Sequence, residues 1–326
     1  MKTITGILMT CTLVIPAAPA AAQGDIQAQV ERIVSSALTI AADALDNLVD
    51  DRAARQRGQG RDDRGPEYTD KFEKTVRLGR NGRLELQGYS GDVEISGGSG
   101  EDVRITATKR THSSNEQAAR TALSATAIDV NERPGAVAIA AQATRGRFSS
   151  VEVDYVISVP AGTSLDLKSY SGDVTIRSMA GDVRLKSYSG DVVVREGKPA
   201  SIDIESISGD VSLEQIDSER VKVNSLSGDV IFKGKLSKTG RYDLSTNSGD
   251  VQVVTDGGAS FELEARTFSG DVTSDFALKL GSMAPSFAAA GNRGARRNND
   301  IRGVANDGGA LLTLHSFSGD ILISKR

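Results

Sequence analysis

The chain has 326 residues, of which 38% are hydrophobic but only 4% aromatic, with 34 glycines and no tryptophan. A compact globular core usually contains more large aromatic side chains, so this composition favours a thin, repetitive β architecture filled by small and β-branched residues. The net charge is −4 with both signs interspersed, which gives no support for binding to nucleic acid or to an anionic membrane surface.

Residues 1–22 have the features of a secretory signal peptide. Lys2 supplies a positive charge, an apolar run follows, and Ala20–Ala22 offers a cleavage site before Gln23. The run is short for a membrane span, so we expect export to the periplasm, the cell surface or the medium, with no stable span after cleavage. A retained anchor and a lipoprotein acylated at Cys11 are the alternatives. Cys11 is the only cysteine, so a mature chain would have no thiol for catalysis or metal binding.

Residues 23–51 are predicted to form an amphipathic helix. Apolar side chains recur at steps of three and four residues, at Ile26, Val30, Ile33, Val34, Ala37, Leu38, Ala41, Leu45 and Leu48. We expect this helix to cap the end of a solenoid, and self-association through it as a coiled coil is the alternative. Its acidic polar face disfavours binding to a membrane surface. Residues 52–67 are rich in Arg, Asp and Gly and predict a flexible linker.

Residues 68–326 are dominated by an internal repeat with a period-two apolar pattern. The tetrapeptide [Ser/Ala]-Gly-Asp-[Val/Ile] occurs nine times. We predict that its Gly-Asp pairs are structural turns, at Gly91–Asp92, Gly172–Asp173, Gly181–Asp182, Gly190–Asp191, Gly209–Asp210, Gly228–Asp229, Gly249–Asp250, Gly270–Asp271 and Gly319–Asp320.

The spacing of these turns predicts how the strands connect. Apolar residues stand seven and five positions before the glycines, and two and four positions after them, with Ser274 as the exception. This is the pattern of strand, turn and strand with one buried face. From Gly172 to Gly270 most copies are 18 to 21 residues apart, whereas Gly181 falls midway and is expected at the opposite corner of its coil. Stacking such units in parallel buries identical columns, so we predict an all-β fold, a right-handed parallel β-helix with about 20 residues per coil.

Each residue of the turn has a physical role. Glycine adopts positive φ without a steric penalty, and the following aspartate can accept hydrogen bonds from local backbone N–H groups. The residue two positions before the glycine is often large, as at Tyr170, Leu226 and Phe268, and the pattern leaves open whether it points inward or outward. Residues 115–124 predict a short helix, and residues 282–309, rich in Ala, Asn, Gly and Arg, predict a mobile insertion.

Three stretches carry a resemblance to a known family. They are LELQGYSGDVEISGGSGEDVRITATKR near the start of the repeats, VDYVISVPAGTSLDLKSYSGDVTI in the centre and GGALLTLHSFSGDILISKR at the end. They resemble the bacterial "putative adhesin" family with β-strand repeats, a domain of unknown function that is similar to the head-GIN autotransporter adhesins. The resemblance covers residues 68–326 and implies a β-helical fold and an envelope or surface location.

No catalytic, metal-binding or cofactor site is predicted. Enzymatic β-helices need a local acid–base cluster that breaks the repeat, whereas here the aspartate occurs in every copy. His112 and His315 are the only histidines, and neither lies in a triad or ligand pattern. A calcium-stabilised repeat and a polysaccharide-active enzyme remain the less favoured alternatives. We therefore expect a non-enzymatic adhesion or interaction surface with an unidentified envelope or surface ligand, or alternatively a scaffolding protein of the envelope.

Overall fold

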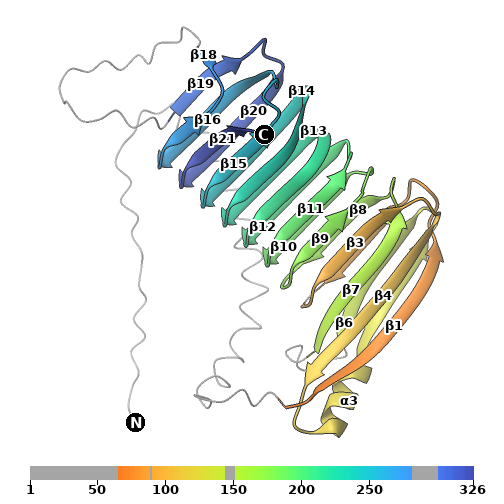
Figure 1. Ribbon diagram of the computed structural model, residues 1–326. Helices are drawn as coiled ribbons and strands as arrows, with labels where there is room; N and C mark the ends of the chain where they lie inside the picture. Colours follow the sequence, from red (N-terminus) through yellow and green to blue (C-terminus); the bar gives the residue numbers. More distant parts are fainter. Residues whose placement is uncertain (1–64, 89, 144–150, 281–299) are drawn as a thin grey trace, which may run out of the picture. The chain divides into compact units, whose positions relative to one another are not determined.

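The computed structural model describes residues 65–88, 90–143, 151–280 and 300–326. These residues form strands throughout, with one helix, so the described part of the chain is an all-β solenoid. The strands lie side by side in a long stack (Figure 1). The predicted signal peptide, the amphipathic helix at 23–51 and most of the predicted linker fall outside the described residues.

The stack has two faces that meet at the Ser-Gly-Asp corner. We call the strands that lead into this corner the entry face and those that leave it the exit face. Two long strands, β13 (Val211–Ser227) and β14 (Val230–Ser248), contribute to both faces because each continues around the opposite corner. The chain therefore passes each Ser-Gly-Asp corner in the same direction, and equivalent residues of neighbouring coils lie above one another.

The entry face consists of twelve strands whose neighbours are joined by hydrogen bonds. In spatial order they are β5 (Thr126–Arg133), β6 (Ala136–Ala143), β2 (Arg83–Gly88), β8 (Ser164–Ser169), β10 (Val183–Ser189), β12 (Ser201–Ser208), the second parts of β13 and β14, β20 (Ala310–Ser318), β16 (Phe261–Ser269), β19 (Asp300–Ala305) and β18 (Leu278–Leu280).

The exit face runs in the same spatial order of coils. Its strands are β1 (Glu67–Arg77), β4 (Asp102–His112), β7 (Val151–Pro160), β3 (Val93–Gly98), β9 (Val174–Arg177), β11 (Val192–Gly197), the first parts of β13 and β14, β15 (Val251–Thr255), β21 (Ile321–Lys325) and β17 (Val272–Ser274).

The core lies between the two faces and confirms the predicted apolar columns. The column two residues after the corner glycine contains Val93, Val174, Val192, Val211, Val230, Val251, Ile321 and Val272, all buried. Strand register places these residues directly over one another, as in the pairs Val192↔Val211 and Val211↔Val230. Fully burying one such side chain stabilises the fold by about 1.5–3 kcal/mol, so each coil contributes through contact with its neighbours.

The prediction of parallel pairing throughout is wrong at both ends of the stack. At one end, β4 pairs antiparallel with both β1 and β7, and β5 pairs antiparallel with β6. At the other end, β19 pairs antiparallel with both β16 and β18. The end of a parallel stack exposes unpaired backbone groups, which attract other strands. Here the ends continue as antiparallel strands, and β1 carries exposed charges such as Lys71 and Glu73 that discourage further pairing.

The short helix predicted at 115–124 is confirmed as α3 (Glu116–Ala125). Asn115 caps its N-terminus, because its side-chain oxygen accepts hydrogen bonds from the backbone N–H of Gln117 at 2.9 Å and of Ala118 at 3.3 Å. At the other end, the buried Lys109 Nζ donates to the Leu123 carbonyl at 3.0 Å. A cation at a helix C-terminus also interacts favourably with the helix dipole, so Lys109 holds α3 on the end of the stack.

The coils do not stack in chain order. The coil of Gly91 lies between the strands β6 and β7 and the coil of Gly172. At the other end, β20 and β21 lie between the coil of Gly249 and the coil of Gly270. The coil of Gly319 therefore does not follow that of Gly270 in the stack, because the last strands return and insert one step back.

The mobile insertion predicted at 282–309 is in part a strand. Residues 300–305 form β19, which pairs antiparallel with β16 and with β18. Polar composition misled the prediction, since backbone hydrogen bonds and two buried positions, Gly303 and Ala305, hold this edge strand. Residues 281–299 lie outside the described residues.

Candidate interaction surface

The Ser-Gly-Asp corner needs glycine for two independent reasons. The stacked corner glycines have φ from 111° at Gly91 to 155° at Gly270, a region that other residues rarely adopt. There is also no space for a side chain, because a Cβ on Gly209 would lie 2.2 Å from the carbonyl oxygen of Gly190 in the next coil. The same contact recurs from coil to coil, so the glycines form one continuous backbone column.

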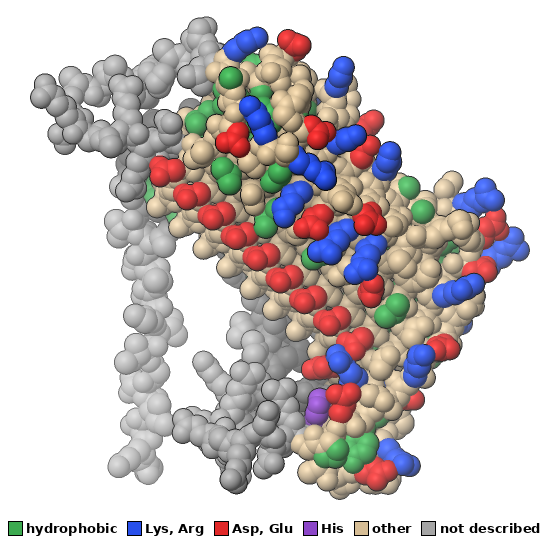
Figure 2. Space-filling view, in the orientation of Figure 1, with side chains coloured by type: hydrophobic (Ala, Val, Ile, Leu, Met, Phe, Trp, Pro, Cys, Tyr) green, Lys and Arg blue, Asp and Glu red, His purple; other side chains and the backbone are tan. Residues whose placement is uncertain are grey.

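The aspartates of the corner form a hydrogen-bonded ladder. In every coil except that of Asp271, the Asp Oδ1 accepts the backbone N–H of the aspartate in the adjacent coil, over distances of 2.7–3.0 Å. The ladder runs in the order Asp154, Asp92, Asp173, Asp191, Asp210, Asp229, Asp250, Asp320 and Asp271. Figure 2 shows a straight row of acidic side chains on this surface.

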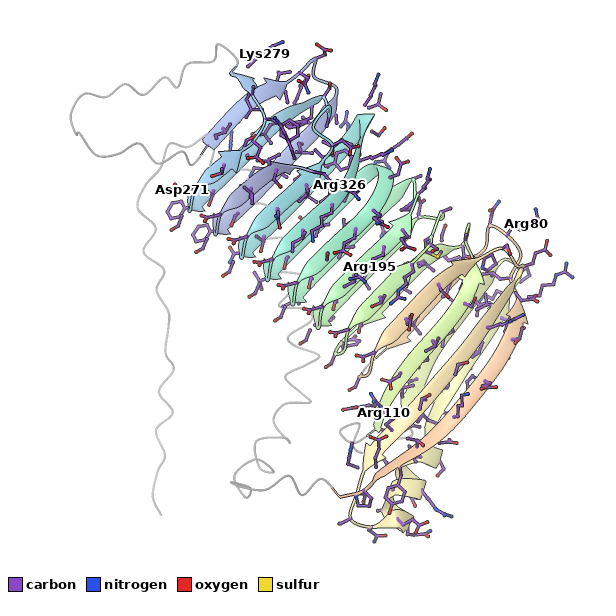
Figure 3. All side chains as sticks on the ribbon, viewed as in Figure 1. Arg80, Arg110, Arg195, Asp271, Lys279 and Arg326 are labelled. Carbon is purple, nitrogen blue, oxygen red and sulfur yellow. The ribbon has the colours of Figure 1, made fainter. Side chains whose placement is uncertain are left out.

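The two ends of this ladder differ. Asp154 belongs to no Ser-Gly-Asp copy, and it accepts two contacts from Arg110, with both nitrogen–oxygen distances at 2.9 Å. At the other end, Asp271 donates its N–H to Asp320, and it is the last aspartate in the series. Arg110 and Asp271 lie toward opposite ends of the stack (Figure 3).

Gly181 and Asp182 lie outside the ladder. They stand between β9 and β10, which is the corner opposite the other copies. The Gly181 N–H donates to the Ala161 carbonyl at 3.0 Å, and Asp182 Oδ1 accepts the N–H of Ser201 at 3.1 Å. The same tetrapeptide thus serves a second corner, and Gly181 is absent from the glycines with positive φ.

The residue two positions before the corner glycine points outward, which settles a question the sequence left open. We call these residues the corner column: in stack order, Tyr170, Tyr188, Ile207, Leu226, Asn247, Phe317 and Phe268. Phe268 is 71% exposed and Phe317 is 53% exposed, and their rings stack with centroids 4.8 Å apart. Tyr170 and Tyr188 stack in the same way at 4.6 Å. Apolar side chains, interrupted at Asn247, therefore follow the carboxylate ladder along the corner.

A column of small hydroxyl residues lies beneath the corner, three positions before the glycine in seven of the coils, whereas Gly88 holds this position before Gly91. It contains Ser169, Ser187, Ser206, Ser225, Thr246, Ser316 and Thr267, all buried. Thr246 Oγ1 donates to the Gly228 carbonyl at 3.0 Å, and Ser316 Oγ donates to the Gly249 carbonyl at 3.0 Å. Thr267 Oγ1 likewise donates to the Gly319 carbonyl at 2.8 Å, so these three hydroxyls tie adjacent coils together from inside. The buried hydroxyls of Ser187, Ser206 and Ser225 have no hydrogen-bond partner among the described residues. The recurrence of this column in the repeat was a signal that the sequence reasoning did not use.

The insertion of β20 brings together two titratable side chains that are distant in sequence. His315 of β20 lies on the entry face close to Asp243 of β14. Partial burial lowers the pKa of His315 and raises the pKa of Asp243, and in each case the charge of the partner opposes this shift. His112 stands apart on β4, with its Nε2 3.6 Å from Glu67 Oε2. The described residues contain no group of three or more His, Cys, Asp or Glu side chains placed to hold a metal ion.

Removal of divalent cations is expected to leave the fold unchanged. One carboxylate oxygen of every ladder aspartate except Asp271 already accepts a backbone N–H, whereas calcium requires six to eight oxygen ligands. We expect a chelator to change neither the circular dichroism spectrum nor the melting temperature. A fall in melting temperature of more than about 4 °C, equivalent to about 1 kcal/mol or more, would instead support the calcium alternative.

Tyr155→Phe is expected to stabilise the protein by about 1 kcal/mol, because the buried Tyr155 hydroxyl has no hydrogen-bond partner among the described residues. Burial raises the pKa of Tyr155 in the folded protein. Above about pH 10 the unfolded chain ionises this hydroxyl while the fold keeps it neutral, so the free energy of unfolding of the wild type falls as the pH rises above that value. The advantage of the Phe variant should therefore grow in alkali.

Urea unfolding at pH 7 and pH 10.5 would measure both effects. Tyr242→Phe is the control, because the Tyr242 hydroxyl donates to the Ser218 carbonyl at 2.7 Å and accepts the Ser237 N–H at 2.8 Å. This variant should lose stability at pH 7. Equal effects of the two substitutions on the free energy of unfolding would contradict the conclusion that the buried Tyr155 hydroxyl has no hydrogen-bond partner.

Taken together, these residues define a two-faced all-β solenoid that displays an acidic ladder and an apolar column at one corner. The described residues contain no helix long and apolar enough to cross a bilayer. The chain belongs to the Toastrack DUF4097 family, a domain of unknown function, whose model matches residues 81–324. Comparison with curated proteins gave no match.

Several solved structures are similar to this chain at low sequence identity. A "putative cell adhesion protein" from Clostridium sporogenes is 13% identical with a TM-score of 0.37, covering 79% of this chain and 100% of its own. A "putative adhesin" from Bacteroides fragilis is 12% identical with a TM-score of 0.36, covering 80% and 97%. A "putative lipid binding protein" from Parabacteroides distasonis is 10% identical with a TM-score of 0.37, covering 79% and 97%.

Proposed function

We propose that this chain is an exported, non-enzymatic interaction protein of the cell envelope, and that its binding surface is the Ser-Gly-Asp corner. The observation that carries the proposal is the corner column, which exposes stacked phenylalanine and tyrosine rings directly beside a carboxylate ladder. Exposed apolar surface in an ordered array is costly in water, and such patches mark interaction sites. Scaffolding within the envelope is the alternative function, and it would use the same repeated surface.

The two faces differ from the corner in their chemistry. Charged side chains on the faces pair across coils, as in Lys186 with Glu205 at 2.7 Å and Arg195 with Glu214 at 2.9 Å. Arg195 is marked on the exit face in Figure 3. Paired and solvated charges give little energy for recruiting a partner, whereas exposed aromatic rings give a large area at a small entropic cost. The corner is therefore favoured as the binding surface.

The proposal includes export and handedness. The basic, apolar and small-residue segments of residues 1–22 support secretion with cleavage before Gln23, and N-terminal sequencing of protein from an envelope fraction would test it. A full-length product confined to the cytoplasm would contradict it. We also propose that the coils are right-handed and contain about 20 residues. Parallel crossovers are almost always right-handed, and the paired strands between β9 and β15 are 18 to 21 residues apart.

The double variant Phe268→Ser/Phe317→Ser is expected to abolish binding to envelope material without unfolding the solenoid, because both rings are exposed. The experiment is to immobilise the purified protein, apply solubilised envelope fractions, and compare retained protein and glycan with the wild type. Val156→Ser is the matched control, because Val156 is 53% exposed on the exit face, as Phe317 is at the corner. Retention that is equal for both variants would show that the corner column is not the binding surface.

A further inference from the structure

The segment Asp300–Arg326, which we call the arm, embraces β16 from both sides. Its strand β19 pairs antiparallel with one edge of β16, and its strand β20 pairs parallel with the other edge. The turn between them passes the start of β16, where Asn306 Nδ2 donates to the Ala259 carbonyl at 2.7 Å. The arm therefore encloses a strand that comes earlier in the chain.

Beyond β16, the arm fills a slot with two complete edges. One edge is the coil of β14 and β15, and the other is the coil of β16 and β17. The Asp320 N–H donates to Asp250 Oδ1 at 2.7 Å, and the Asp271 N–H donates to Asp320 Oδ1 at 2.9 Å. Within the slot the arm buries Leu312, Leu314, Ile321 and Ile323 completely.

The two coils that border the slot have the spacing and the column residues to stack on one another without the arm. Gly270 follows Gly249 by 21 residues, the same separation as between Gly228 and Gly249, which do stack on one another. The column positions also correspond, because Leu263 and Ala265 occupy in β16 the places that Tyr242 and Leu244 occupy in β14. The arm is therefore an inserted coil and not a link that the preceding coils require.

We propose that the arm is exchangeable and that the slot binds the arm of a second copy of this chain. An arm from another molecule would make the same backbone ladder, the same Asp contacts and the same apolar contacts, so the free energy of docking is nearly identical. This self-assembly goes beyond the proposed function and does not depend on the corner column.

The segment that connects β18 to the arm is longer than is needed to join two neighbouring strands. Strands β18 and β19 are paired neighbours, yet residues 281–299 join them. A segment of that length reaches up to about 60 Å when extended, enough to carry the arm to an adjacent molecule. A tethered arm has an effective concentration on the order of 1 mM for its own slot, so exchange should increase with protein concentration toward that value.

Two single-cysteine chains test the exchange directly, in a Cys11→Ser background that removes the native thiol. One carries Asn247→Cys in the slot, and the other carries Phe317→Cys in the arm. The two positions are neighbours in adjacent coils, because Thr246 pairs with Ser316 and Ser248 with Ser318. Neighbouring strands are about 4.8 Å apart, a Cα–Cα separation at which two cysteines can form a disulfide. A disulfide between the two chains in excess of that given by a control pair therefore indicates that the arm of one lies in the slot of the other.

The two chains are unfolded, mixed in equal amounts, refolded over a range of concentrations up to about 1 mM and oxidised gently. The control pair is Ile207→Cys with Leu226→Cys, at the same corner position in two coils that follow each other in the chain. We expect the arm–slot pair to give at least five times more mixed dimer than the control pair, rising with concentration. Mixed dimer at the control level across the whole range would overturn the proposal, provided that circular dichroism shows refolded protein.

Discussion

Gly209→Val is expected to lower the free energy of unfolding by about 3–5 kcal/mol, since it combines backbone strain with overpacking. Gly209 has a φ of 112°, where a β-branched residue is strongly disfavoured. Its Cβ would also lie 2.2 Å from the Gly190 carbonyl oxygen, and that backbone atom cannot move without disturbing the adjacent coil. The substitution therefore strains two coils at once.

Hydrogen exchange would locate the damage caused by Gly209→Val. A coil contacts only its neighbours, so protection should fall between Gly190 and Gly228 and persist around Gly270 and Gly319. The control is Gly258→Val, because a Cβ at Gly258 meets nothing within 4 Å. That variant should change stability by no more than about 0.5 kcal/mol. If the two variants behave alike, the glycine column does not specify the fold.

Leu314→Ala is expected to cost about 2–5 kcal/mol, the usual range for truncating a fully buried leucine. Leu314 lies between Leu244 in β14 and Ala265 in β16, so a cavity at this position loosens the coils on both sides. Amide protection should fall in β16 and in the second part of β14, and it should remain in β12. A stack in chain order would leave β14 protected, because the last coil would then contact only the coil of Gly270.

The control for this prediction comes from the same strand. Leu311 is 39% exposed on the outer surface, so Leu311→Ala should change stability by no more than about 0.5 kcal/mol. Loss of protection in β16 alone after Leu314→Ala would contradict the intercalated order of coils.

The sequence by itself determined the structure of the single coil of this solenoid. Apolar residues at fixed offsets from the corner glycine, as at Val211 and Leu213, occupy the core because period two sends alternate side chains to one face. Glycine at the corner followed from the need for positive φ, and Asn115 indicated the start of α3. These features depend on local geometry, which a repeat records directly.

Only the tertiary structure decided the order in which the coils stack and which residues make up the surface at the Ser-Gly-Asp corner. Copies such as Gly270 and Gly319 carry equivalent columns, so local pattern cannot show that the second stacks on Gly249 before the first. The direction of the corner column, by contrast, needed no tertiary information, because the alternation of β16 continues through buried Thr267 to exposed Phe268. Asp154 joined the ladder without the motif, through its position beside Asp92. Pairing between equivalent strands is settled by which neighbours bury the most surface and leave the fewest backbone groups unpaired, and these are properties of the whole stack.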